Sequence, residues 1–86
     1  MDPRVATCRA ELDAIDREVL ALLARRRELV RALFALKDAD GIPRVDPARE
    51  RALLDDRRAT AAALGLPPEL ADAVFRAVLA SSHTLP

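Results

Sequence analysis

A heptad repeat runs from Val5 to Leu36 and contains neither glycine nor proline. Apolar residues at about every 3.5 positions form a narrow stripe that a helix buries against another helix. The a positions are Val5, Leu12, Val19, Arg26 and Leu33, and the d positions are Cys8, Ile15, Leu22, Leu29 and Leu36. Of these residues, which we call the heptad seam, Arg26 alone is charged. The repeat predicts one long helix that packs along this seam.

This long helix is expected to begin at Asp2 and Pro3 and to continue to about Lys37. Asp2 can cap the helix, and proline suits the first helical position. More than thirty residues at about 1.5 Å each span roughly 50 Å, whereas a compact chain of this size is only about 30 Å across. Because the helix is longer than such a globule, its seam needs a second chain. We therefore predict an obligate homodimer with intertwined helices.

The rest of the chain predicts two shorter helices. Gly41 and Pro43 fall in a predicted loop. Asp46, followed by a proline, opens a second helix that ends at Gly65. Prolines at positions 67 and 68 open a third helix that ends near Ser82. The sequence thus predicts an all-α fold with one long and two shorter helices, in a single domain over residues 1–86.

Composition excludes several classes of function. The chain is 51% apolar and 2% aromatic, which suits a helical bundle. Its 14 basic and 14 acidic residues give a formal net charge of zero, so we expect no nucleic-acid partner. The longest apolar run, from Val19 to Ala24, is too short to span a membrane. A single cysteine, Cys8, suits a reducing compartment, and we expect a cytoplasmic protein.

The residue types also limit the chemistry. Cys8 and His83 are far apart in the sequence and do not suggest a nucleophile and its base. The chain has no cluster of cysteines and histidines for a metal, and no glycine-rich phosphate loop. We therefore predict a site without metal or cofactor, which binds a small anion and stabilises charge.

Three cations along the long helix could hold such an anion. Arg26 cannot lose its charge, so its place in the seam calls for an anion or a hydrogen-bond network. Lys37 lies about 16 Å from Arg26 along the helix axis and points in nearly the same direction. Arg9 lies about 25 Å from Arg26 along the axis, toward the start of the helix. Arg9 would have to come from the partner chain of an antiparallel pair. Arg26 could instead set the register of the helices, or pair with Asp16 or Glu18 of another helix.

The start of the second helix adds candidate residues. Arg49 and Glu50 fall in its first turn, where free backbone N–H groups favour anions. Asp46 is explained by its capping role, Arg49 could be a surface charge, and Glu50 suits the positive end of the helix. At the other end of the chain, we expect Ser82 and His83 to lie at a fraying helix terminus, with a solvated imidazole.

Taken together, these residues resemble the pattern of the all-helical (AroQ-type) chorismate mutases. The typical pattern has an arginine before an Ile-Asp pair, a Leu-Leu-x-x-Arg core, a lysine eleven residues later and an Arg-Glu pair opening the second helix. The matching features are the run LDAIDREVLALLARRREL from Leu12 to Leu29, Lys37, the run DPARER from Asp46 to Arg51, Gly65-Leu66, Phe75 and Ser82. The resemblance covers about Val5 to Thr84, and its joint spacing is more specific than any one motif.

The resemblance implies a homodimer in which Arg9 of one subunit completes the site of the other. It further implies that Arg9 and Arg26 bind the two carboxylates of chorismate, with Ser82 assisting Arg26. Lys37 would donate to the ether oxygen and a carboxylate. Asp46 and Glu50 would bind the ring hydroxyl through backbone and side chain, and Arg49 would support the pocket.

The implied reaction is the rearrangement of chorismate to prephenate, which needs no nucleophile, metal or cofactor. Oriented donors and a preorganised pocket supply this type of catalysis.

One position departs from the family pattern. Four residues after the serine the family carries a glutamine or glutamate beside the ether oxygen, and this chain has Pro86, which offers no donor. His83 or a water could substitute, or the enzyme could be weak. The alternatives are a sister enzyme of the same fold, either an isochorismate–pyruvate lyase or a 4-amino-4-deoxychorismate mutase, and a weakly active helical dimer that acts as a binding or regulatory module.

Overall fold

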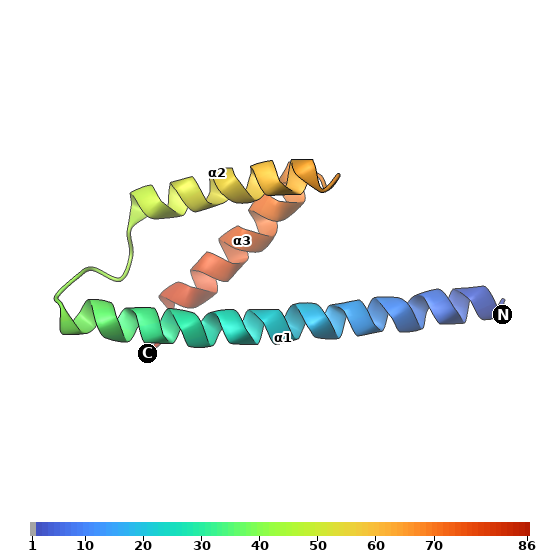
Figure 1. Ribbon diagram of the computed structural model, residues 1–86, viewed down its shortest axis with the longest axis horizontal. Coiled ribbons are helices and arrows are strands. Elements are labelled where there is room, and N and C mark those ends of the chain that lie inside the picture. Colours follow the sequence, from blue (N-terminus) through green and yellow to red (C-terminus); the bar gives the residue numbers. More distant parts are fainter. Residues whose placement is uncertain (1) are drawn as a thin grey trace. The chain divides into compact units, whose positions relative to one another are not determined.

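The computed structural model describes residues 2–86, which form three helices and, within this range, no strand. The helices are α1 (Pro3–Ala39), α2 (Pro47–Ala63) and α3 (Pro68–His83), as Figure 1 shows. The predicted all-α class and the three helices are confirmed, and each predicted boundary lies within two residues of the observed one. None of the helices in this range combines the length and the apolar character needed to cross a bilayer. The intertwined homodimer and the single domain over residues 1–86 stay predictions.

Contacts within the chain fall into two compact units, Met1–Leu33 and Phe34–Pro86. The first unit is the greater part of α1. Its helix start is capped as predicted, because the Asp2 carboxylate accepts a hydrogen bond from the Arg4 backbone N–H at 2.8 Å. The large apolar seam residues of this unit are exposed, from 41% for Val5 to 67% for Leu29, whereas Arg26 is half-buried. This helix therefore offers a long apolar stripe, as the heptad predicted.

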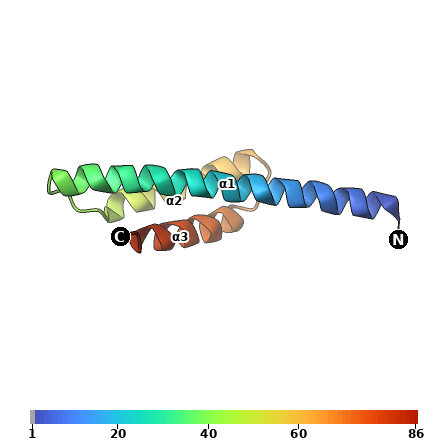
Figure 2. The ribbon, with the colours of Figure 1, turned by 90° about the horizontal axis from the view of Figure 1, so that it is seen from below.

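The second unit, Phe34–Pro86, has a core of its own. It contains the last turn of α1 and the hairpin of α2 and α3, which pack side by side (Figure 2). The buried apolar residues are Phe34, Leu53, Leu54, Ala61 and Leu85. Burying such side chains contributes about 1.5–3 kcal/mol each. These five side chains are covered within the chain, unlike the apolar seam residues of Met1–Leu33.

Two glycines end the first two helices in the same way. Gly41 and Gly65 have φ angles of +66° and +74°, a left-handed conformation that glycine adopts without strain. After α1, the Ile42 N–H donates to the Lys37 carbonyl at 2.8 Å. After α2, the Leu66 N–H donates to the Ala61 carbonyl at 2.9 Å. Both are Schellman ends, which satisfy helix carbonyls that would otherwise lack partners. The predicted stop at Gly65 is confirmed.

Charged side chains tie α2 to α3. Arg58 of α2 pairs with Asp55 of its own helix and with Asp72 of α3. Asp72 also accepts from Arg76 Nε at 2.6 Å. The Arg76 and Arg58 guanidiniums hold the pKa of Asp72 below its ordinary value. A network of this kind orients the two helices more firmly than an isolated surface pair does.

Candidate active site

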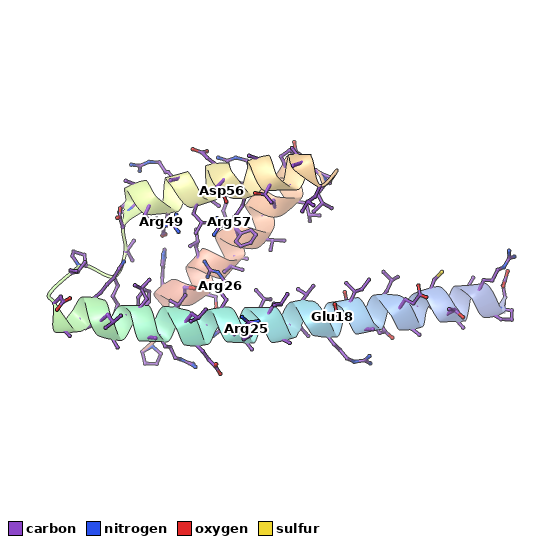
Figure 3. The ribbon with its side chains drawn as sticks, in the orientation of Figure 1. Glu18, Arg25, Arg26, Arg49, Asp56 and Arg57 are labelled. Carbon is purple, nitrogen blue, oxygen red and sulfur yellow. The ribbon has the colours of Figure 1, made fainter. Side chains whose placement is uncertain are left out.

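The predicted site residues divide between the two units. Arg9 and Arg26 lie on α1 within Met1–Leu33. Phe34–Pro86 holds the other five, namely Lys37, Asp46, Arg49, Glu50 and Ser82. Figure 3 labels Arg26 on α1 and Arg49 on the first turn of α2. The second unit thus brings together most of the polar groups that the sequence selected. The contributions of Arg9 and Arg26 to the same site stay predictions.

Lys37 is held at the junction between α1 and the following loop. It lies in the last turn of α1, and its Nζ donates to the Arg44 carbonyl at 3.1 Å. A hollow of about 370 Å³ opens beside it, lined by Lys37, Ile42, Pro43, Val45, Asp46 and Pro47. An ammonium group carries three N–H donors. The contact with Arg44 therefore orients Lys37 and leaves donors for an oxygen in the hollow.

Arg44 fixes the loop, a role that the sequence did not reveal. Its guanidinium pairs with Asp38 at 2.7 Å and donates to the Leu85 carbonyl at 3.1 Å. It also lies over the Phe34 ring, with its central carbon 5.0 Å from the ring centroid. The guanidinium holds the pKa of Asp38 below its ordinary value. The Arg44 carbonyl accepts the hydrogen bond from Lys37. The contacts of the Arg44 side chain, which act as a clamp on the loop, therefore also fix the acceptor that positions the lysine.

The start of α2 has the local structure that its sequence predicts. Asp46 is the N-cap, and its carboxylate accepts from the Arg49 N–H at 3.1 Å. Its backbone carbonyl accepts from the Glu50 N–H at 3.0 Å, which starts the helix. Asp46 therefore aligns the first turn, which carries Arg49 and Glu50, and Asp46 itself lines the hollow beside Lys37.

Glu50 is bound by a histidine from the other helix of the hairpin. His83 Nε2 lies 2.6 Å from Oε1 and 3.0 Å from Oε2 of Glu50. Their side chains are 40% and 20% exposed, respectively. His83 is exposed at the end of α3, as expected, but the helix includes it rather than fraying before it, and its ring contacts Glu50. The pairing joins residues 33 positions apart, so no local spacing predicts it.

Ser82 is buried, with only 5% of its surface exposed. Its hydroxyl donates to the Val78 carbonyl of the same helix at 3.0 Å. The hydrogen of this hydroxyl is thus used within α3, and only the lone pairs of the oxygen remain for another donor. The predicted contact between Ser82 and a substrate carboxylate is not part of this arrangement and stays a prediction.

A helical scaffold that presents an oriented ammonium, an oriented carboxylate and a nearby hollow is suited to hold a small polar molecule. Comparison with known proteins identifies the class. The model of the chorismate mutase type II family matches residues 8–85. This chain therefore belongs to that family, and the resemblance noted in the sequence is confirmed.

The similar proteins include longer ones. A T-protein of Enterobacter agglomerans is 39% identical over 84 residues, which cover 98% of this chain and 22% of that protein. A T-protein of Haemophilus influenzae is 37% identical over 75 residues, or 87% of this chain and 20% of that protein. A chorismate mutase of Methanocaldococcus jannaschii is 36% identical over 55 residues, or 64% and 56% respectively. This chain thus spans about a fifth of the length of the T-proteins. No solved structure gives a significant match.

Proposed function

We propose that this chain converts chorismate to prephenate. One observation carries the proposal: in a member of the chorismate mutase type II family, Lys37 and Asp46 line the same hollow and Glu50 follows one helical turn later. These are the groups that the resemblance assigns to the ether oxygen and the ring hydroxyl. Their arrangement within one compact unit supports the assignment.

The chemistry requires orientation rather than a reactive group. In this rearrangement a carbon–oxygen bond breaks while a carbon–carbon bond forms, and negative charge grows on the ether oxygen. The Lys37 ammonium stabilises that charge, and its bond to the Arg44 carbonyl places it before the reaction begins. Donors fixed in advance need no reorganisation when the charge develops. Glu50 accepts from the ring hydroxyl and sets the orientation of the ring.

We further propose a homodimer in which Arg9 comes from the partner subunit. Arg26 and this arginine would hold the two carboxylates of the substrate in the compact conformation that reacts. The exposed seam of α1 supports the dimer, because apolar stripes of this length are stable when another helix covers them. The cytoplasmic location stays a prediction from the sequence.

A direct assay tests the reaction. The purified chain is incubated separately with chorismate, isochorismate and 4-amino-4-deoxychorismate, and the products are identified by chromatography and mass spectrometry. We expect prephenate from chorismate. Pyruvate from isochorismate, or rearrangement of the amino compound alone, would replace the proposal with one of the sister enzymes. Binding of chorismate without any product would instead indicate a binding or regulatory module.

Pro86 is the observation that favours a sister reaction. It offers no hydrogen-bond donor at a position where the family pattern has an amide or carboxyl side chain. The variant Pro86→Gln restores such a donor, and we expect it to raise the turnover of chorismate. A lower turnover of chorismate in this variant would show that the position serves another purpose.

A further inference from the structure

His83 is the most informative residue that the proposed reaction has not used. It stands at the end of α3 and reaches across to α2, where its Nε2 contacts both carboxylate oxygens of Glu50. A hollow of about 390 Å³ opens at this point, lined in part by Glu50, Arg51, Arg76 and His83. The imidazole therefore meets the one carboxylate that the proposed mechanism assigns to the substrate ring.

The contact leaves the carboxylate able to bind a second donor. An ionised carboxylate accepts at about four lone-pair positions. A single N–H shared between the two oxygens, at 2.6 and 3.0 Å, uses only part of this capacity. It nevertheless restricts the rotation of a side chain that is otherwise flexible. The other charged side chain of α3 at this hollow, Arg76, donates through Nε to Asp72.

We propose that His83 is a positioning residue for Glu50. Its Nε2–H fixes the Glu50 carboxylate so that the remaining lone pairs face the ring hydroxyl of the substrate. This inference rests on the proposed function. It also assigns His83 a role other than replacing the donor missing at Pro86, because its Nε2 is engaged by Glu50.

A double-mutant cycle separates these two roles. The variants His83→Ala, Glu50→Ala and the double variant are compared by their kcat and KM for chorismate. We expect His83→Ala to lower kcat/KM roughly tenfold, and to lower it by less than about twofold once Glu50 is already alanine. His83→Gln, whose amide can donate to the carboxylate, should recover most of the loss. Glu69→Gln is the matched control, since it changes an exposed carboxylate of α3 that does not line this hollow, and should stay within about twofold of the parent.

The single histidine of the chain gives a second measurement that does not depend on turnover. Selective labelling of histidine with ¹⁵N makes His83 the only imidazole signal in the NMR spectrum. Replacing Glu50 with alanine should shift the Nε2 resonance, whereas replacing the exposed Glu69 of α3 should not. An unchanged Nε2 resonance in Glu50→Ala would show that the pair does not form, and would overturn the proposal.

The outcomes distinguish this inference from the function on which it rests. If the parent chain makes prephenate but the effects of His83→Ala and Glu50→Ala are additive, the histidine acts independently and the positioning role is overturned. If His83→Ala keeps full kcat/KM, the role is overturned while the reaction stands. If the parent chain makes no prephenate, both fall, even where the NMR shift shows that the pair exists.

Discussion

The two units of this chain differ in how far they bury their apolar side chains. Phe34–Pro86 buries a core of five apolar side chains, ends α1 and α2 with Schellman turns and joins α2 to α3 through paired charges. The unit Met1–Leu33 holds most of α1, whose large apolar seam residues are exposed, with Leu29 at 67%. The first arrangement is stabilised within the chain, whereas the second suits association. The difference agrees with the proposal that one region organises polar groups and that the other associates with a second chain.

The largest expected effect comes from a charge placed in the seam. Leu22→Asp should weaken the dimer at least roughly a hundredfold, because a buried carboxylate without a partner costs several kcal/mol. It should also abolish turnover, since Arg9 would no longer reach the other site. Sedimentation velocity and the chorismate assay measure the two effects. The control Ala24→Asp changes the opposite side of the same helix, and an equal loss in this control would refute the role of the seam.

The next largest effect is expected from a substitution in the unit Phe34–Pro86. Lys37→Ala should lower kcat roughly 10²- to 10³-fold, the usual cost of removing a donor from a developing oxyanion. The hairpin and the dimer should both remain, because the hydrogen bond from Lys37 to the Arg44 carbonyl lies in the loop, outside the α2–α3 hairpin and the heptad seam. Circular dichroism and sedimentation check this point. Near-normal turnover in Lys37→Ala would remove the lysine from the mechanism.

A smaller effect, on the melting temperature, is expected when one ion pair is removed from each unit in turn. Arg44→Ala removes a pair with Asp38, a bond to the Leu85 carbonyl and a contact with the Phe34 ring, and should lower the melting temperature by roughly 5–10 °C. Arg4→Ala removes the pair with Asp2, in which the Arg4 side chain is 89% exposed, and should change it by less than about 2 °C. Equal shifts in thermal denaturation would show that Arg44 does not act as a clamp.

The smallest effect is a dependence on pH. Arg76 and Arg58 hold the pKa of Asp72 below its ordinary value in the folded chain. The unfolded chain therefore takes up this proton first as the pH falls, and the stabilisation present above about pH 4 is lost below it. Asp72→Asn should be less stable at neutral pH and should lose less on acidification. Parallel melting curves of the parent and the variant between about pH 3 and pH 6 would contradict this origin.

Local signals in the sequence predicted the helices. They did not predict the contacts between residues that are far apart in the sequence. Asp46 caps α2 as expected, and Gly65 adopts the left-handed conformation that a helix stop requires. α1 continues two residues past Lys37 because its stop is set by Gly41. These features depend on neighbours within a few residues, which a pattern can record.

The site shows where such patterns fail. The spacing selected Lys37, Asp46 and Glu50, which the structure places in one unit. It did not reveal that Arg44 donates to Leu85, 41 residues away, or that His83 meets Glu50. Those pairs exist because the hairpin of α2 and α3 brings distant residues together, and only tertiary packing determines them. The contribution of Arg9 from a second chain, and that of Arg26 from the same chain, stay predictions.

The turn after α1 has a consequence for genetics. The carbonyl of Lys37 accepts from Ile42, so the backbone of this lysine is part of the turn that Gly41 makes possible. A Cβ at Gly41 would meet no atom within 4 Å, yet its backbone conformation would be strained. In a screen for loss of function, substitutions at Gly41 would therefore be recovered alongside those at Lys37. A residue with no side chain would score as part of the active site.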